Sequence, residues 1–365
     1  MSVATAHWES PQTEVQLLQD LVLRHSPSKQ EKEAVGFLAS WCEERGMRSH
    51  IDKAGNAIAE WGQGDRVICL LGHIDTVPGD LPIRVSGGFL TGRGTVDAKG
   101  PLASMAGALA RLVASLAEPE HWKILLVGAV EEECETSWGA KYLLQSLGPV
   151  VPEFTIIGEP SGWNRITLGY RGCQRAQYRV QVENAHSASD HQTAAELAML
   201  AWLEIQEKVR QYNGSRKDPS FDALSVTLLD FCSNDNGIEQ EARLNLHFRL
   251  PPGLSPGNLC QMFAESGFDG LRFGPAQPAY VAQRNSPLVR GLLQSIRSAG
   301  GTPQFSLKTG TSDMNIVGPA WECPIVAYGP GDPNLSHTPE ERVSLREYLT
   351  SIRVLETFLR KAVLE

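Results

Sequence analysis

The hydrophobic pattern of the first 165 residues alternates between helical spacing and short continuous apolar runs. Apolar side chains recur every three or four residues over 13–46, with a polar break at 25–28, so two helices are expected there. Three later runs of strand length each end in His, Asp or Glu: VICLLGHID (67–75), KILLVGAVEEE (123–133) and FTIIGEP (154–160). Helical patterns at 100–117 and 137–147 lie between them. Buried strands separated by helices indicate a layered α/β domain.

From about residue 170 the chain changes to strands in which apolar and polar residues alternate. Such alternation is typical of an antiparallel sheet with one covered face, and it predicts strands at 174–183, 225–231 and 243–251 with a helix at 192–212. The first pattern then returns, with a helix at 286–299, strands near 303–307 and 323–328, and a helix near 344–363. We therefore expect a discontinuous α/β domain, 1–170 and 283–365, with an α+β domain inserted at 171–282.

Composition and charge exclude several classes of protein. The 365 residues are 42% hydrophobic and 21% charged, which is typical of a folded globular protein. The formal net charge of −9 argues against nucleic acid or an anionic membrane as the main partner. No apolar run approaches the ~20 residues that span a bilayer.

Two features predict a cytoplasmic protein. The N-terminal segment MSVATAHWESPQTEV lacks the basic and then apolar layout of a signal peptide. The seven cysteines are scattered singly, without a CxxC pair, as is usual for reduced thiols.

Residues of metal-ligand type gather in five short segments, most of them at the ends of predicted strands. Alone, a histidine at a strand end is more often a structural residue, and an acidic triplet is more often a solvated surface. Together, two histidines and several carboxylates match the ligands of two divalent cations such as zinc, cobalt or manganese. The five segments are GHID (72–75), GRGTVDAKG (92–100), VEEEC (130–134), IGEP (157–160) and SHTPEE (336–341).

The spacing within two of these segments suggests a division of roles. Asp75 lies two residues after His73, so in an extended strand its carboxylate would accept the second N–H of the imidazole. Glu132 and Glu133 would point to opposite sides if extended. One of them could then bind a metal while its neighbour acts as a base.

The series GHIDTVP, GRGTVDAKG, EEE, GEP, AHSAS and SHTPEE resembles the M20 family of dinuclear metallopeptidases and deacylases. This family contains acetylornithine deacetylase, succinyl-diaminopimelate desuccinylase, aminoacylases and carboxypeptidase G2. The motifs cover nearly the whole chain in the family's order. The resemblance implies a zinc-peptidase-like catalytic domain of the layered α/β class with an inserted α+β dimerisation, or lid, domain.

The resemblance also implies the ligands of two metal ions, zinc or cobalt, in each subunit. One ion would be bound by His73, Asp97 and Glu159, and the other by Asp97, Glu133 and His337. Asp97 would bridge the two ions, and the family commonly has a cis peptide bond directly after this residue.

Two further residues of this centre receive roles from the resemblance. Asp75 would orient His73, and Glu132 would be the general base. Because three glutamates stand in a row, a shift by one would make Glu131 the base and Glu132 the ligand. We prefer the first frame, since relatives commonly carry Asp at the place of Glu131.

Residues outside the metal motifs are implied to act on the substrate. His186 in AHSAS matches the histidine that reaches the active site of a partner subunit and stabilises the oxyanion, although Glu183 and Asn184 stand where relatives usually have glycine. Arg249 resembles the arginine that binds a substrate carboxylate. The loop KTGTSDMN (308–315) resembles a substrate-binding loop, which gives Lys308, Thr309, Gly310 and Thr311 as candidates; the alternative is a simple turn into a helix.

Within the family, the chain is most similar to the LysW-lysine/LysW-ornithine hydrolase branch. This similarity implies release of lysine or ornithine from the C-terminal glutamate γ-carboxyl of an acidic amino-group carrier protein (LysW-like), in lysine or arginine biosynthesis. Alternatives are a small-molecule deacylase for acetylornithine or acetyl-lysine, a dipeptidase or carboxypeptidase, and a non-catalytic binding protein. An acidic carrier would need a basic patch on this acidic chain, for which the candidates are Arg165, Arg171, Arg175, Arg179, Arg216 and Lys217.

Overall fold

The computed structural model describes residues 10–186, 188, 190–216, 220–265 and 267–364. Its contacts divide the chain into two compact units. Unit 1 comprises Met1–Gly169, Ala282–Ser306 and Ser312–Glu365, and unit 2 comprises Tyr170–Val281 and Leu307–Thr311. The sequence pattern assigned 307–311 to the α/β domain. The segment groups with unit 2 because the backbone N–H and Nε–H of Arg171 donate to the carbonyl oxygens of Lys308 and Thr309.

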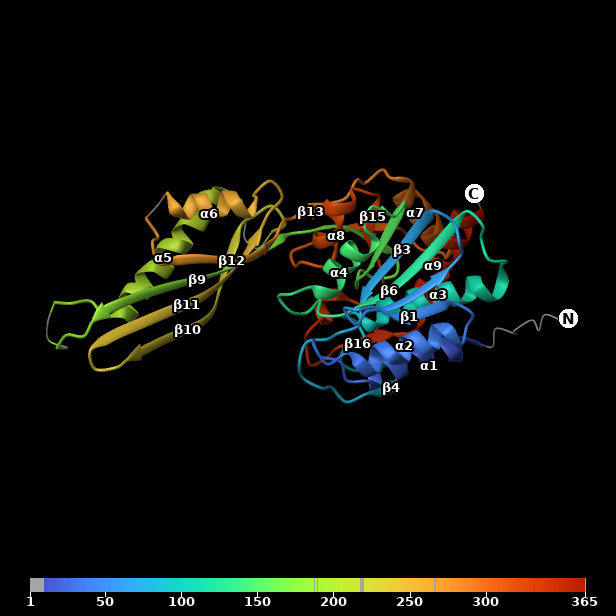
Figure 1. The fold of residues 1–365 in the computed structure, drawn as a ribbon, viewed down its shortest axis with the longest axis horizontal. Helices are drawn as coiled ribbons and strands as arrows, with labels where there is room; N and C mark the ends of the chain where they lie inside the picture. Colours follow the sequence, from blue (N-terminus) through green and yellow to red (C-terminus); the bar gives the residue numbers. More distant parts are fainter. Residues whose placement is uncertain (1–9, 187, 189, 217–219, 266, 365) are drawn as a thin grey trace. The chain divides into compact units, whose positions relative to one another are not determined.

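A mixed sheet forms the centre of unit 1 (Figure 1). Its strand order is β1-β2-β6-β3-β7-β15-β8, and β14 pairs with β8. The adjacent strands β6, β3, β7 and β15 are parallel, so their carboxyl ends meet at one edge of the sheet. The bounds are β1 (Arg48–Ile51), β2 (Ala57–Trp61), β3 (Arg66–His73), β6 (Trp122–Ala129), β7 (Phe154–Gly158), β8 (Arg165–Tyr170), β14 (Gln304–Lys308) and β15 (Ile325–Ala327).

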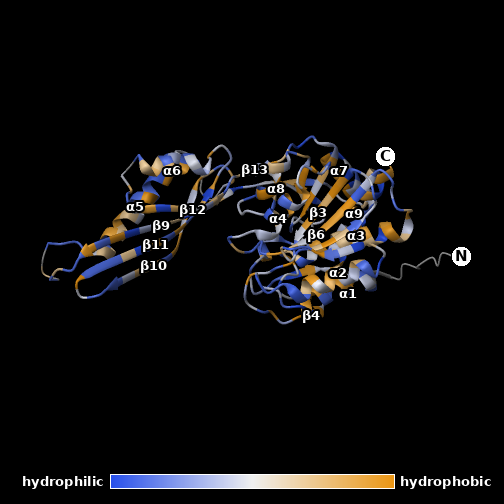
Figure 2. Ribbon diagram, viewed as in Figure 1, coloured by the Kyte–Doolittle hydropathy of each residue, from blue (hydrophilic) through white to orange (hydrophobic). Residues whose placement is uncertain are grey.

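A hydrophobic core joins this sheet to most of the helices of unit 1. Figure 2 shows β3 and β6 as strongly hydrophobic strands. Helix α3 packs against β3, where Leu102 lies so close to Gly72 that a larger residue in the strand would force it away. The helices are α1 (Ser10–Leu23), α2 (Lys32–Glu43), α3 (Lys99–Ser115), α4 (Trp138–Leu147), α7 (Pro287–Ser298), α8 (Met314–Trp321) and α9 (Leu345–Leu364), with a short 3-10 turn at Pro333–Leu335.

A small three-stranded sheet lies beside two of the predicted metal segments. Its order is β16-β5-β4, with β4 (Arg84–Ser86), β5 (Phe89–Thr91) and β16 (Arg342–Ser344). β5 directly precedes the segment of Asp97, and β16 directly follows the segment of His337. The antiparallel pairing of β16 with β5 therefore ties together two parts of the chain that are distant in sequence.

Unit 2 is an antiparallel four-stranded sheet covered on one face by two helices. The order is β10-β11-β9-β12, and the alternating buried residues of β9 and β11 face a core of their own. Helix α5 begins with a capping box between Thr193 and Glu196, and it packs against β9 and β11. The bounds are β9 (Gly172–Glu183), β10 (Ser225–Asp235), β11 (Glu239–Leu250), β12 (Leu271–Gln277), β13 (Tyr280–Val281), α5 (Ala194–Asn213) and α6 (Pro256–Ala264).

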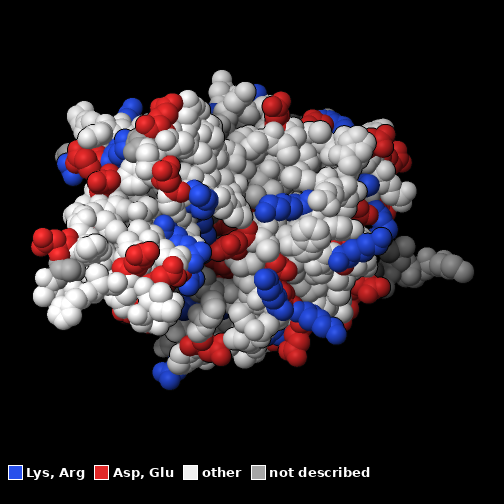
Figure 3. Space-filling view, turned by 60° about the vertical axis from the view of Figure 1, so that its left-hand side comes forward, with Lys and Arg blue, Asp and Glu red and all other residues white. Residues whose placement is uncertain are grey.

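The mixed α/β fold class is confirmed, and the long elements lie near their predicted positions. Sequence patterns did not predict the short strands β1, β2, β4, β5, β8, β13 and β16, nor α6 and β12. Among the described residues, no helix is both long and apolar enough to cross a membrane. On the face drawn in Figure 3, basic and acidic side chains are interspersed.

Candidate metal centre

His73 is the last residue of β3, and its ring orientation is set by the backbone. Its Nδ1 lies 3.0 Å from the carbonyl oxygen of Asp75, to which it donates, and 3.5 Å from Oδ1 of the same residue. In the neutral imidazole the proton is therefore on Nδ1, and the lone pair of Nε2 is available to a ligand. The expected contact with the Asp75 carboxylate is the longer of the two, because the strand ends at His73 and the extended alternation does not continue.

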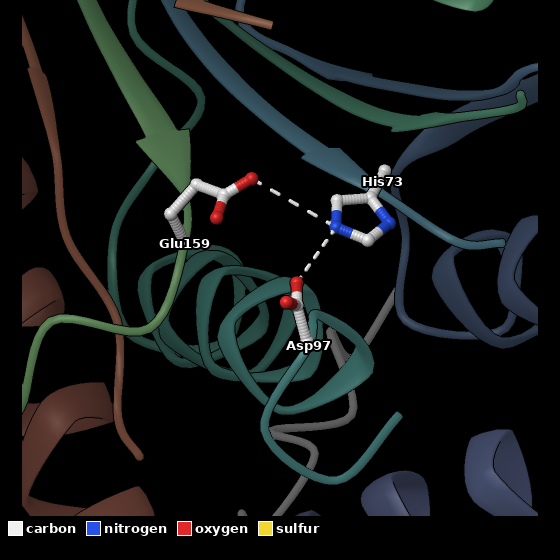
Figure 4. A group of neighbouring side chains, drawn as sticks. All are labelled: His73, Asp97 and Glu159. Atoms are coloured by element: carbon white, nitrogen blue, oxygen red, sulfur yellow. Dashed lines mark hydrogen bonds and ion pairs between the residues drawn. The ribbon is translucent and has the colours of Figure 1, made fainter. Parts of the chain in front are cut away.

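The Nε2 atom of His73 faces two carboxylates that come from different parts of unit 1 (Figure 4). It lies 3.1 Å from Oδ1 of Asp97 and 3.8 Å from Oε1 of Glu159. Asp97 lies two residues before the first residue of α3, and Glu159 directly follows β7. The peptide bond between Asp97 and Ala98 is cis. These three side chains form the first of the predicted ligand groups.

A second group shares Asp97 with the first. Nε2 of His337 lies 2.8 Å from Oε1 of Glu133 and 3.3 Å from Oδ2 of Asp97. The two oxygens of Asp97 thus face two different imidazoles, since Oδ1 is the atom nearest His73. This is the arrangement that a carboxylate between two cations requires.

The three consecutive glutamates lie in a turn after β6 rather than in an extended strand. The Asp75 carboxylate accepts hydrogen bonds from the backbone N–H groups of Glu132 and Glu133, at 3.1 and 3.0 Å, and from the hydroxyl of Ser28. The predicted alternation of the two side chains therefore does not apply. Asp75 holds the turn itself, a contact that the sequence reasoning missed.

The side chains of this turn separate into two sets. Ligand atoms of Glu132 and Glu133 lie within 4.8 Å of each other and of His73. The carboxylate of Glu131 instead accepts a hydrogen bond from the hydroxyl of Thr136. Glu132 and Glu133 therefore face the shared centre.

Electrostatics indicate that this cluster suits cations. Burial raises the pKa of Glu132 and of Glu159 well above the usual range, and neighbouring carboxylates raise both further. The carboxylates of Asp97 and Glu133 raise the pKa of His337 to about 10. Burial opposes ionisation of Asp97, yet hydrogen bonds from His337 and His73 lower its pKa. Acids this crowded need positive charge, and imidazole with carboxylate is a donor set that zinc or cobalt accepts.

Two residues without an assigned role in the sequence analysis belong to the surroundings of the centre. Asp313 is buried, its Oδ1 has no hydrogen-bond partner among the described residues, and burial raises its pKa to about 7. Glu341 is buried and accepts a hydrogen bond from the backbone N–H of Asp97. Both lie in motifs already quoted, TSDMN and SHTPEE, but nothing in the sequence distinguishes a buried acid from an exposed one there.

The predicted substrate-binding residues form a cluster in unit 2. Nη1 of Arg249, near the end of β11, donates to Oγ1 of Thr311 at 3.1 Å. Lys308, Thr309 and Gly310 complete the same short segment, and an added side chain at Gly310 would meet no atom within 4 Å.

His186 also lies in unit 2, in the loop between β9 and α5. Its side chain is exposed, and its Nδ1 accepts a hydrogen bond from the backbone N–H of Ala188.

The profile of peptidase family M20/M25/M40 matches residues 69–361. The chain is 40% identical over 355 residues to a LysW-lysine hydrolase of Deinococcus radiodurans, covering 95% of this chain and 96% of the relative. It is also 40% identical over 347 residues to a putative LysW-lysine/LysW-ornithine hydrolase of Thermococcus kodakarensis, covering 95% and 91%.

Solved structures agree on the fold. The M20 metallo-carboxypeptidase Sso-CP2 of Sulfolobus solfataricus superposes with a TM-score of 0.79 at 17% identity, covering 96% of this chain and 99% of that one. The Bacillus subtilis protein YxeP, described as a dinuclear metal-binding peptidase of the M20 family, has a TM-score of 0.69 at 14% identity, covering 97% of both chains. With the profile match and the 40% identical relatives, these findings show that the chain belongs to peptidase family M20/M25/M40.

Proposed function

We propose that this protein is a metal-dependent amide hydrolase that releases lysine or ornithine from the C-terminal glutamate γ-carboxyl of an amino-group carrier protein. The observation that carries the hydrolase is the pair of ligand groups sharing Asp97, with Glu132 beside them. The relatives that are 40% identical over 95% of the chain support the carrier substrate, since both are named for hydrolysis of LysW conjugates.

The proposed ligands follow the two groups. His73, Asp97 and Glu159 would bind one ion, and Asp97, Glu133 and His337 the other. Zinc is the expected ion and cobalt the alternative, because both accept mixed imidazole and carboxylate ligands. Bound there, two divalent cations would polarise the scissile carbonyl and lower the pKa of a water molecule.

Glu132 is the proposed base, because it lies beside the ligands and its backbone is held by Asp75. It would take one proton from the attacking water as the oxygen forms a bond to the carbonyl carbon. It would then give this proton to the leaving nitrogen as the C–N bond breaks. The products are the free γ-carboxylate of the carrier and the free α-amino group of lysine or ornithine.

Arg249 and the 308–311 segment are the proposed substrate-binding residues. A guanidinium can bind a carboxylate through two parallel hydrogen bonds, and the products of this reaction carry carboxylates on both sides of the broken bond. The hydrogen bond from Arg249 to Thr311 supports a shared role for the two residues.

A homodimer formed through unit 2 is the proposed assembly, with His186 acting on the oxyanion in the site of the partner subunit. β10 is an edge strand, and an edge offers free backbone groups to a second copy. Exposed apolar residues of α5 also support an interface, namely Met199, Leu200 and Leu203.

An acidic carrier would bind where basic side chains are exposed, and several of these lie in unit 2. Four exposed arginines lie on the sheet face that points away from α5: Arg175, Arg179, Arg243 and Arg272. Arg171 does not belong to this set, because it is buried and its guanidinium donates to backbone carbonyl oxygens. Arg165 lies in unit 1, Arg216 is exposed beyond α5, and Lys217 lies outside the described residues. Glu183, Glu239 and Glu241 lie on the same face, and Glu241 forms ion pairs with Arg179 and Arg243. The face therefore carries charges of both signs, and a basic patch for an acidic carrier stays a prediction.

The proposed compartment is the cytoplasm, where the carrier route of lysine or arginine biosynthesis would operate. All seven cysteines are free, as expected in a reducing environment.

Deacylation of acetylornithine or acetyl-lysine is the second candidate function, because the same metal chemistry would serve it.

The substrate prediction compares two classes of amide. Purified enzyme with zinc or cobalt is expected to release free lysine or ornithine from the loaded carrier with kcat/KM at least about tenfold above that for acetylornithine or acetyl-lysine, because only the carrier offers contacts beyond the reacting amide. Amino-acid analysis of the products measures both rates. Equal or faster turnover of the acetylated compounds would select the deacylase instead.

The base prediction concerns Glu132→Gln, which keeps the size of the side chain but removes its proton acceptor. We expect kcat to fall about 10²–10⁴-fold while the number of bound metal ions stays the same. Steady-state kinetics and elemental analysis of the same preparation test this. Activity like that of the unmodified enzyme would exclude Glu132 as the base.

A pair of substitutions tests which of the three consecutive glutamates binds a metal ion. After chelation and readdition of zinc, Glu133→Ala is expected to retain about one ion per chain, and Glu131→Ala about two, because only Glu133 contacts His337. Mass spectrometry under native conditions counts the ions. Two ions in both variants would move the frame by one residue, because Glu132 would then be the ligand.

Action of His186 across a dimer is tested by mixing two inactive variants. If equal amounts of Glu132→Gln and His186→Ala exchange subunits at random, half of all dimers contain one chain of each variant. Each mixed dimer then has one site with an intact base and an intact histidine from the partner subunit. Activity should then rise to about a quarter of the unmodified value. No gain after proven subunit exchange would mean that His186 acts within its own chain.

A further inference from the structure

One buried carboxylate, that of Glu341, holds the segment that carries Asp97. Its Oε1 accepts hydrogen bonds from the backbone N–H groups of Gly94, Val96 and Asp97, at 2.9, 3.0 and 3.2 Å. The carbonyl oxygen of Glu341 also accepts from the N–H of Gly92, at 3.2 Å. Four backbone groups within six residues therefore depend on a single side chain and its own peptide group.

The second carboxylate oxygen extends these contacts to the segment of His337. Oε2 of Glu341 pairs with Nη1 of Arg93 at 2.7 Å. The same Nη1 reaches the carbonyl oxygen of Thr338, the residue after His337, at 3.5 Å. Arg93 belongs to the segment of Asp97 and Glu341 to the segment of His337, so their ion pair connects the two segments.

The side chain of Glu341 is 1% exposed, so its charge has almost no contact with water. A carboxylate in such a place is stable only when its oxygens are fully paired, and here every partner belongs to the Asp97 segment. The bonds are therefore strong and directional, and the segment cannot shift without leaving the charge unpaired.

His337 needs such support for a second reason. Its φ is +62°, in the left-handed region that residues other than glycine seldom adopt. A residue stays in this region only when its surroundings over-determine it. β16 fixes the chain on one side of the segment through its pairing with β5, and Glu341 is the residue directly before that strand.

We propose that Glu341 is a positioning residue that holds Asp97 and His337 at the separation at which both bind the same cation. This inference rests on the proposed ligand set. Glu341 contacts neither His73 nor Glu159 through any described hydrogen bond, so the ion of His337 depends on it more strongly than the ion of His73 does.

Glu341→Gln is the informative substitution because it preserves size and removes one acceptor. The amide can accept from the three backbone N–H groups or face Arg93, but its NH₂ group then opposes a donor on the other side. Glu340→Gln is the matched control, since this adjacent glutamate is exposed. His337→Ala removes the proposed ligand directly.

The experiment titrates zinc into each chelated, full-length variant by calorimetry and records activity at each metal concentration. For Glu341→Gln we expect one binding event to weaken about 10–100-fold, with kcat largely recovered at saturating metal, because the residue supports the ligands without touching the reaction. Glu340→Gln should bind both ions like the unmodified protein. A Glu341→Gln variant whose two events match those of Glu340→Gln would overturn the inference.

The histidine variant separates this inference from the function on which it rests. If His337→Ala binds two ions as tightly as the unmodified protein, the proposed ligand set is wrong, and the role of Glu341 falls with it. If His337→Ala loses one ion while Glu341→Gln keeps both, only the role of Glu341 is wrong. Arg93→Met serves if Glu341→Gln lacks the circular dichroism of a folded protein: weakening of one event supports the inference, and two unchanged events refute it.

Discussion

The burial of several carboxylates at one edge of a parallel sheet is the constraint on which the rest of unit 1 depends. Asp97, Glu132, Glu133 and Glu159 come from three separate segments. In the part of the chain that the structure describes, the imidazoles of His73 and His337 lie among them and offset part of their charge. The sheet and α3 supply the packing that brings these groups together against their mutual repulsion. Bound divalent cations would offset the repulsion between these carboxylates, and their binding free energy would stabilise the fold.

Sequence patterns predicted the parts of this arrangement that rest on simple periodicity. The strands β3, β6 and β7 are continuous apolar runs because both faces of the sheet are covered, and the acids at their ends follow from parallel pairing. The ligand groups come together as the motif resemblance led us to expect. The roles of individual residues rest on that resemblance, since periodicity alone does not separate a ligand from a base.

Other features depend on contacts that no local pattern records. Strand β5 has three residues and is defined by its pairing with β16, which lies about 250 residues away. β12 contains Gly274 and Pro275, which break its alternation. The 307–311 segment groups with unit 2, where it accepts hydrogen bonds from Arg171, a candidate for a basic patch that is in fact buried. Asp75 contacts backbone groups that become its neighbours only after folding.

The contact of Asp75 has an evolutionary consequence. The turn after β6 is held through the backbone N–H groups of Glu132 and Glu133, which any residue other than proline provides. Replacement of Glu132 therefore leaves the bonds that shape the turn intact. A lineage of such proteins could lose its chemistry by one substitution and keep a folded, cation-binding scaffold, on which selection for recognition alone could then act.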